Sequence, residues 1–329
     1  MRAVKNLLVL YTGGTIGMLQ TPEGLAPASG FEARMREHLA LLADAPRLQW
    51  SLRELDPLID SANMQQANWL AMRDAIVDAV EHGGHDGVLV LHGTDTLAYS
   101  AAALSFLLLG LPVPVLLTGS MLPAGAPDSD AWDNLLGALR LFESGLAEGV
   151  QLYFHGQLLH GCRASKLRSE AFDAFVALPR HREGERATAI PPTLDYRQRR
   201  HPVRLAVLPV VPGLQASLVQ AMLAAGVQGL VLECYGSGTG PSDDQTLLDA
   251  LHEARKGGVM IVAISQCPEG SVVFDTYAAG SRLRDTGLVS GGGMTREAAL
   301  GKLFALLGAG LDVQAAEHWF ALDLCGERA

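Results

Sequence analysis

The stretch GVLVLHGTDTLAYSAAAL, Gly87–Leu104, decides the fold because an apolar run stops at His92 and gives way to glycine and threonine. The same change occurs about eighty residues earlier, in LVLYTGGTIGM, Leu8–Met18. Apolar runs without polar alternation are typical of parallel strands that helices cover on both faces. Ligands of open parallel sheets bind at the carboxyl ends of the strands, where both of these loops would lie.

Short Val/Leu/Ile runs alternate with segments of helical period along the rest of the chain, which predicts an α/β fold with mostly parallel sheets. The predicted strands are 6–11, 87–92, 113–118, 151–154, 204–210, 229–235 and 260–265. The predicted helices include 65–83, 101–109, 134–142, 214–225, 243–256 and 295–307. Ser242 and Gln245 predict a capping box for the helix at 243–256.

The 329 residues exceed the ~250 at which single cores tend to split, so we expect two domains. A charged, proline-bearing stretch without period runs from Arg180 to Pro202. We therefore predict a larger N-terminal domain at 1–180, a linker at 181–202 and a smaller C-terminal α/β domain at 203–329. The basic cluster Arg197–His201 is interpreted as solvated or salt-bridged surface.

A formal net charge of −10 argues against nucleic acid or an anionic membrane as the main partner. No apolar run reaches the ~18 residues of a membrane span, and the N-terminal MRAVKNLLVLY is interpreted as a first strand, not as a signal peptide. The four cysteines are far apart and form no C-x-x-C pair, which favours a reducing cytoplasm and disfavours a metal site.

Both strand-end loops combine glycines, which allow close approach to a ligand, with several hydroxyls. The first loop is Thr12-Gly13-Gly14-Thr15 and the second is Gly93-Thr94-Asp95-Thr96. Neither loop has the Lys-Ser/Thr ending of a P-loop or the G-x-G-x-x-G spacing, which disfavours a nucleotide site. Ordinary strand-to-helix turns capped by threonine would explain either loop alone.

A threonine hydroxyl becomes a useful nucleophile only when a neighbouring group takes its proton. Asp95 stands beside Thr94, and Lys166 follows the strand predicted at 151–154. A Thr-Lys-Asp set requires a lysine that is partly removed from water, so that it exchanges a proton near neutral pH. From spacing alone, a single lysine is more often an ordinary surface residue.

The segments YTGGTIGM, DSANM, LHGTDTLAYSAAALSF, TGSMLP, ASKLRSEAFDAF and SQC follow one another as in the bacterial type I, cytoplasmic L-asparaginases. The chain resembles that branch of the asparaginase/glutaminase superfamily over nearly its whole length. The resemblance implies the two-domain asparaginase-like fold and hydrolysis of L-asparagine to L-aspartate and ammonia, without cofactor or metal.

The resemblance also implies residue roles. Thr15 matches the family nucleophile, which forms a β-acyl-enzyme, while Thr94, Asp95 and Lys166 match a second triad. Whether Thr15 or Thr94 attacks, and whether water attacks directly, is left open by the resemblance; we take Thr15. The implied substrate contacts are Gly14, Asp60, Ser61, Ala62, Gly93, Thr94, Asp95 and Ser120.

Two departures from the family pattern affect these expectations. The loop after the first strand has Leu25 where the family carries a tyrosine, and we predict that Tyr277 replaces it. Glu233 stands where the family members that asparagine regulates have an arginine, whereas Cys267 is retained and Ser165 replaces a threonine. Exchanging arginine for a carboxylate reverses the charge, so asparagine activation should be absent or altered.

Two other functions stay open at this point. One is the asparaginase-like subunit of a transfer-RNA-dependent amidotransferase, although that type carries an extra N-terminal domain and this chain begins at the first strand. The other is a non-catalytic amino-acid sensor on the same fold. The resemblance further implies a homodimer or homotetramer, and L-glutamine as a second substrate to test.

Overall fold

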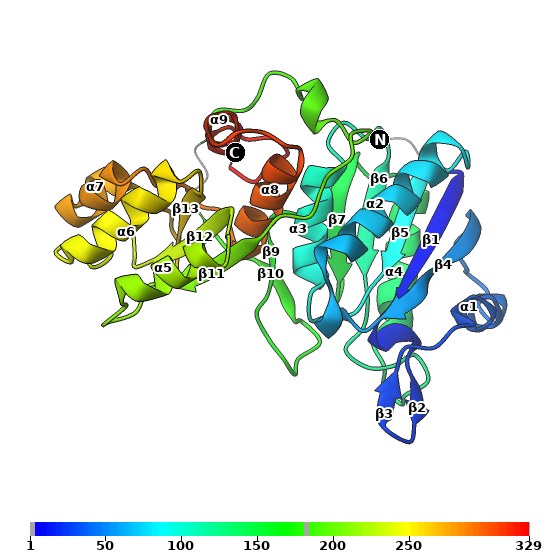
Figure 1. The fold of residues 1–329 in the computed structure, drawn as a ribbon. Helices are drawn as coiled ribbons and strands as arrows, with labels where there is room; N and C mark the ends of the chain where they lie inside the picture. Colours follow the sequence, from blue (N-terminus) through cyan, green and yellow to red (C-terminus); the bar gives the residue numbers. More distant parts are fainter. Residues whose placement is uncertain (1–3, 181–183, 329) are drawn as a thin grey trace. The chain divides into compact units, whose positions relative to one another are not determined.

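The computed structural model describes residues 4–180 and 184–328, and the chain divides into two compact units, Met1–Ala177 and Leu178–Ala329. Each unit is built on a parallel sheet with helices, which confirms the predicted two-domain α/β fold class (Figure 1). The boundary between the units lies three residues before the predicted domain end at 180, and 181–183 of the predicted linker lie outside the described residues.

The first unit contains a six-stranded sheet of order β4-β1-β5-β6-β7-β8, parallel except for its last pair. The strands are β1 (Asn6–Gly13), β4 (Gln49–Ile59), β5 (Gly87–Leu91), β6 (Pro114–Thr118), β7 (Gly149–Phe154) and β8 (Gln157–His160). From β1 the chain first moves to β4 on one side and then to β5 and β6 on the other. The strand order therefore reverses between β1 and β5, which is where ligands bind in such sheets.

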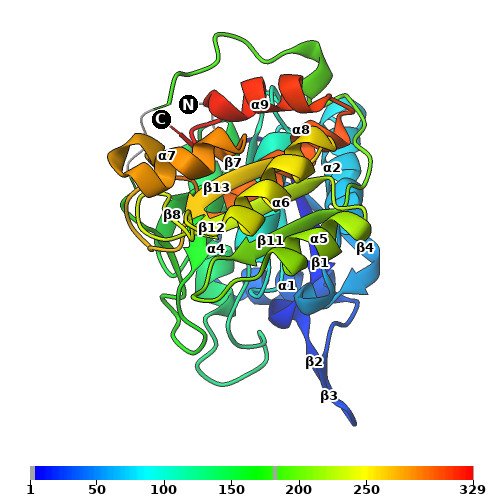
Figure 2. The same ribbon diagram turned by 60° about the vertical axis from the view of Figure 1, so that its left-hand side comes forward.

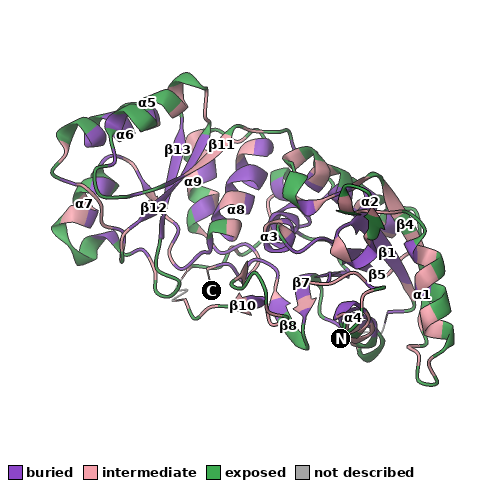
Figure 3. Ribbon diagram, turned by 90° about the horizontal axis from the view of Figure 1, so that it is seen from below, coloured by how far each residue is buried: buried purple, intermediate pink, exposed green. Residues whose placement is uncertain are grey.

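Helices cover both faces of this sheet, as the unbroken apolar strands predict (Figure 3). The helices are α1 (Phe31–Ala40), α2 (Gln66–Glu81), α3 (Leu97–Leu107) and α4 (Ala131–Ser144). Residues of α1 and α4 share one core with alternate side chains of β1 and β5, including Val9 and Leu89. The α3 helix is buried nearly all round, which explains why its sequence shows so little polar alternation.

Several elements of the first unit were not predicted. The β4 strand escapes a search for apolar runs because its exposure alternates at the sheet edge. Two short antiparallel pairs also appear, β2 (Leu19–Thr21) with β3 (Gly24–Ala26), and β9 (Ala164–Lys166) with β10 (Phe175–Ala177). Short strands of this kind carry too few residues for a period to show.

The second unit contains a four-stranded parallel sheet of order β11-β12-β13-β14. The strands are β11 (Leu205–Pro209), β12 (Gly229–Cys234), β13 (Met260–Ser265) and β14 (Val289–Ser290), and the helices are α5 (Ala216–Ala224), α6 (Gln245–Lys256), α7 (Ala278–Asp285), α8 (Arg296–Gly308) and α9 (Val313–Ala321). Side chains of α5 and α6 form a core with β11–β13, in front of which they lie in Figure 2. The α8 and α9 helices also pack against strands of this sheet.

One local prediction in the second unit is wrong, and another is wrong at a single residue. The α6 helix is capped by Asp244, whose Oδ1 accepts from the Leu247 N–H at 3.1 Å, because the helix begins two residues later than a Ser242 cap requires. Within the cluster interpreted as surface, Arg200 is buried, and its Nε donates to the Ala305 carbonyl at 3.0 Å. Carbonyl acceptors of Ala305 in α8 and of Gln198 compensate the burial of this guanidinium.

Within residues 4–180 and 184–328, none of the helices combines the length and the apolar character that crossing a membrane requires.

Candidate active site

The two glycine-threonine loops meet at the carboxyl ends of β1 and β5. A Cβ atom at Gly14 would lie 2.2 Å from the Gly93 nitrogen, so the two backbones are in direct contact. Gly14 also has a φ of +84°, a conformation that costs other residues free energy. Only glycine at both positions allows this approach, and it places Thr15 and Thr94 on adjoining turns.

Lys166 reaches this edge from the short β9–β10 pair. Its Nζ donates to Thr94 Oγ1 at 2.9 Å and to Asp95 Oδ1 at 3.0 Å. The lysine side chain is 20% exposed, whereas that of Asp95 is 61% exposed. The structure thus brings together three of the predicted catalytic residues, with the lysine largely removed from water and the carboxylate open to it.

Thr15 begins a short 3-10 turn, Thr15–Gly17, directly after β1. Two hydrogen bonds from other segments hold this turn in place. The Ile16 carbonyl accepts from the Ala124 N–H at 3.1 Å, and the Gly17 carbonyl accepts from Arg34 Nη2 at 2.9 Å. Among the residues that the structure describes, the Thr15 hydroxyl has no hydrogen-bond partner. The half-buried hydroxyl is therefore available to a ligand.

A buried polar chain lies beneath the second loop. Trp69 Nε1 donates to Ser100 Oγ at 2.9 Å, Ser100 Oγ lies 2.9 Å from His92 Nε2, and His92 Nδ1 lies 2.7 Å from the Gly93 carbonyl. Since a carbonyl only accepts, the proton of the neutral imidazole is on Nδ1, and Ser100 donates to Nε2. Burial lowers the pKa of His92 to about 4, the bond to Gly93 opposing it, which keeps the ring neutral.

This chain fixes the direction of the peptide group between Gly93 and Thr94. In a trans peptide the C=O and N–H point in opposite directions, so holding the Gly93 carbonyl toward His92 directs the Thr94 N–H away from it. Within the described part of the chain, the Thr94 N–H has no acceptor, although the residue is buried. Buried N–H groups are nearly always paired, which makes this one a donor for a bound molecule.

The pKa of His92 makes stability dependent on pH. Between about pH 6.5 and pH 4 the histidine of the unfolded chain takes up a proton that buried His92 does not. Lowering the pH through this range should therefore reduce the free energy of unfolding, by up to about 3 kcal/mol. His92→Asn should reduce this loss, as measured by denaturant unfolding at pH 7.5 and 4.5. The exposed His82→Asn is the control and should lose as much as the wild type; an equal loss in His92→Asn would contradict the prediction.

The predicted substrate-binding segment lies against the second loop. A Cβ atom at Gly93 would stand 2.5 Å from Ser61 Oγ, and Thr96 Oγ1 donates to the Ser61 carbonyl at 2.8 Å. Asp60 caps the short 3-10 turn Ser61–Asn63, because its Oδ1 accepts from the Ala62 N–H at 3.2 Å. Ser61 is buried beside Gly93 with its hydroxyl toward the site, whereas Asp60 has a demonstrable structural role.

The loop after β6 closes another side of this edge. A Cβ atom at Gly119 would lie 2.2 Å from the His92 carbonyl oxygen, so Gly119 and Ser120 adjoin the second loop. The Ser120 hydroxyl donates to the Leu122 carbonyl at 2.6 Å, within its own loop. The hydrogen of this hydroxyl is therefore used within the loop, so that Ser120 can donate to a ligand only through its backbone N–H.

The remaining predicted residues belong to other elements. Ser165 is in β9, in the first unit, opposite Val176. In the second unit, Cys267 is exposed, as is Tyr277, which is 61% exposed at the start of α7. Glu233 is buried at the end of β12, where it accepts two hydrogen bonds from Arg296, from Nε at 2.6 Å and from Nη2 at 2.8 Å.

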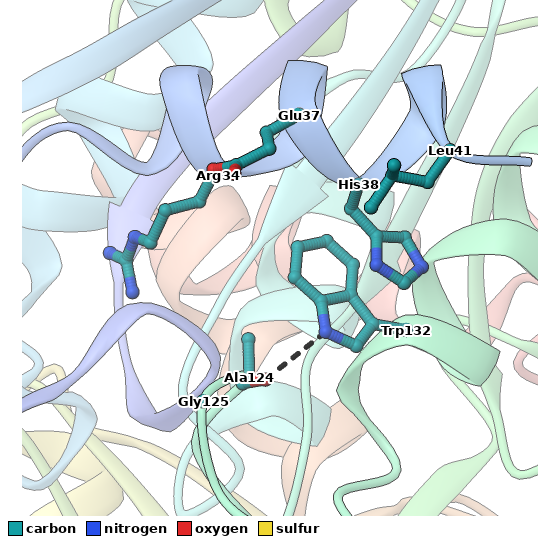
Figure 4. Close-up of a pocket in the computed structure, with 7 residues that line it drawn as sticks. All are labelled: Arg34, Glu37, His38, Leu41, Ala124, Gly125 and Trp132. Atoms are coloured by element: carbon teal, nitrogen blue, oxygen red, sulfur yellow. Dashed lines mark hydrogen bonds between the residues drawn. The ribbon is translucent and has the colours of Figure 1, made fainter.

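A cavity of about 210 Å³ lies between α1 and α4 (Figure 4). His38 and Trp132 stack there with ring centroids 3.8 Å apart, and Trp132 Nε1 donates to the Ala124 carbonyl at 3.1 Å. The other lining residues are Arg34, Glu37, Leu41 and Gly125. None of the predicted site residues lines this cavity, so it is separate from the threonine-lysine-aspartate cluster.

The fold and the site define an α/β protein with a threonine-lysine-aspartate cluster at the switch point of its first sheet. Residues 6–190 match the family described as Asparaginase, N-terminal, and 204–320 match the Glutaminase/Asparaginase C-terminal domain. The chain belongs to the asparaginase family, as the sequence predicts.

Individual relatives are similar over their whole length. The L-asparaginase 1 of Escherichia coli is 35% identical over 98% of both chains. Among solved structures, the L-asparaginase I of Vibrio cholerae has a TM-score of 0.85 at 31% identity, covering 99% of this chain and 100% of its own. The thermostable L-asparaginase of Thermococcus kodakarensis also has a TM-score of 0.85 at 31% identity, covering 98% of this chain and 99% of its own.

Sequence reasoning missed several residues that shape these surroundings. His92, Ser100 and Arg296 were not singled out, nor were Asp130 and Asn134 at the start of α4. Asp130 and Asn134 are four residues apart, so that one turn of a helix separates them. This spacing of two polar residues, next to the helix predicted at 134–142, is the one sequence signal that they interact.

Proposed function

We propose that this protein hydrolyses L-asparagine to L-aspartate and ammonia. The observation that carries the proposal is the contact of Lys166 with both Thr94 and Asp95 beside the Thr15 turn. Family membership supports the same reaction. In this reaction the Thr15 Oγ attacks the side-chain amide carbon, the C–N bond breaks, and the proton of the Thr15 hydroxyl is passed to the nitrogen, which leaves as ammonia. Water then cleaves the aspartyl ester and restores the threonine.

Lys166 is proposed to move protons in this sequence. Its side chain is largely shielded from water, and its Nζ donates to the Thr94 hydroxyl. Asp95 balances the lysine charge and presents an open carboxylate for the α-ammonium of the substrate. We propose that the lysine passes the proton of the attacking hydroxyl to the leaving group by way of the Thr94 hydroxyl that it contacts.

The Thr94 N–H is proposed to stabilise the oxyanion of the tetrahedral intermediate. It is directed away from His92 and has no acceptor among the described residues, so it is oriented before substrate arrives. Prearranged donors of this kind are usually a large contribution to acyl transfer. Ser61 is proposed to bind the α-carboxylate, together with the backbone at Asp60 and Ala62, while Gly14 and Gly93 leave room for the substrate.

The remaining expectations are proposals of the same kind. We place the protein in the cytoplasm, which agrees with four cysteines that form no disulfide, and expect a homodimer or homotetramer. Tyr277 is our candidate for the missing loop tyrosine, since β3 presents Leu25 instead, and its hydroxyl is exposed.

Asparagine should not act as an activator of this protein. Arg296 neutralises the Glu233 carboxylate through two hydrogen bonds, so neither side chain presents a free charge to a second asparagine. The initial rate should therefore rise hyperbolically with asparagine concentration, and Cys267→Ser should leave the curve unchanged. A sigmoidal curve that becomes hyperbolic in Cys267→Ser would contradict this prediction.

Ammonia release by the purified protein, measured over a wide range of asparagine and glutamine concentrations, tests the proposed reaction. We expect release from asparagine, and Tyr277→Phe in the same assay tests the tyrosine. Binding of asparagine without release would indicate an amino-acid sensor. Release that depends on a co-purifying second subunit would indicate an amidotransferase component.

A further inference from the structure

The loop that carries Ser120 is held by two buried polar side chains at the start of α4. The Met121 N–H donates to both carboxylate oxygens of Asp130 at 3.0 Å, and the Leu122 N–H donates to Oδ1 at 3.1 Å. Asn134 Nδ2 donates to the Gly119 carbonyl and to Asp130 Oδ2, both at 3.0 Å. Asp130 is 6% exposed and Asn134 is 1% exposed.

These hydrogen bonds fix the orientation of the two peptide groups on either side of Ser120. Asp130 holds the Met121 N–H, so the Ser120 carbonyl of the same peptide points away from Asp130. Asn134 holds the Gly119 carbonyl, so the Ser120 N–H of that peptide points away from Asn134. Both backbone polar groups of Ser120 are thereby directed away from α4.

The backbone polar groups of Ser120 are unpaired among the residues that the structure describes, although the residue is fully buried. Buried backbone groups rarely lack partners. Since Gly119 packs against the His92 carbonyl, the unpaired N–H and carbonyl of Ser120 lie beside the loop of Thr94, whose N–H is the proposed donor to the substrate amide. A carbonyl there accepts a hydrogen bond from an amide nitrogen and repels a carboxylate oxygen.

We propose that Asp130 is a positioning residue that sets the preference of this site for a side-chain amide over the corresponding acid, by orienting the Ser120 carbonyl toward the amide nitrogen. The inference rests on the proposed function. Without the Asp130 carboxylate the peptide between Ser120 and Met121 turns more freely, and its N–H then faces the ligand for part of the time. An N–H favours the carboxylate of the product.

The test compares the wild type with Asp130→Asn for two quantities, the KM for asparagine and the competitive Ki for L-aspartate. We expect the ratio of KM to Ki to rise about tenfold, which corresponds to the loss of one oriented hydrogen bond. A general loosening of the fold would lower kcat or the melting temperature without changing this ratio. The exposed Asp133→Asn, on the same turn of α4, is the matched control and should keep the wild-type ratio.

Asn134→Ala provides a second variant if Asp130→Asn does not fold, because it removes the donor to Asp130 and to the Gly119 carbonyl. Its ratio should change in the same direction. An unchanged ratio in a folded variant of either kind would overturn the inference, while ammonia release by the wild type would leave the proposed function intact. No release from asparagine by the wild type would instead refute the proposed function.

Discussion

Lys166→Met is expected to lower kcat for asparagine by about a thousandfold, the middle of the range for general acid–base groups. Methionine keeps the length and apolar stem of the side chain but loses the hydrogen bonds to Thr94 and Asp95. The KM should change little, because the segment proposed for the α-carboxylate and the exposed Asp95 carboxylate proposed for the α-ammonium both stay in place. The loss should therefore appear in the chemical step.

Lys166→Arg separates charge from proton transfer. Arginine keeps a positive charge beside Asp95 but does not give up its proton near neutral pH. If Lys166 moves a proton, the arginine variant should be nearly as slow as the methionine variant; if the charge alone matters, it should recover most of the rate. Lys256→Met, at an exposed position of α6, should keep full activity. More than a tenth of the wild-type kcat in both Lys166 variants would refute the role proposed for this residue.

The part of the site that the sequence predicts lies at strand ends. An apolar strand followed by glycine and threonine identifies Thr15 and Thr94, because parallel strands bring their carboxyl ends to one edge of the sheet. The position of Lys166 depends instead on a three-residue strand and its antiparallel partner, which show no period. Its contact with Thr94 was predicted through family resemblance and not through periodicity.

Buried polar partners are the other part that pattern alone does not reveal. Periodicity distinguishes apolar from polar positions, but it does not say which polar side chain is paired inside. Arg200 illustrates this limit, since its charged neighbours suggested surface, whereas its guanidinium is buried and donates to the carbonyls of Ala305 and Gln198. Glu233 illustrates the same limit, because its ion-pair partner Arg296 is sixty-three residues away in the sequence.

Thr15→Val is expected to lower kcat by about ten-thousandfold, since single substitutions of a nucleophile have effects of this size or larger. Valine has nearly the shape of threonine but no hydroxyl, and the Thr15 hydroxyl has no bond to any described residue that the change would break. Folding and affinity for L-aspartate should therefore stay close to the wild type. Steady-state ammonia release, thermal unfolding and calorimetric titration with aspartate measure the three quantities.

Thr15→Ser and Thr94→Val show which threonine attacks. Serine restores the hydroxyl, so Thr15→Ser should keep at least about a tenth of the activity, because the nucleophilic atom is retained. Thr94→Val should also be slow, since it removes the hydroxyl that Lys166 contacts. Mass spectrometry of acid-quenched reactions should nevertheless find the aspartyl ester on the peptide that contains Thr15 in the wild type. An ester on the Thr94 peptide, or a Thr15→Val variant with near-normal turnover, would assign the attack to Thr94 or to water.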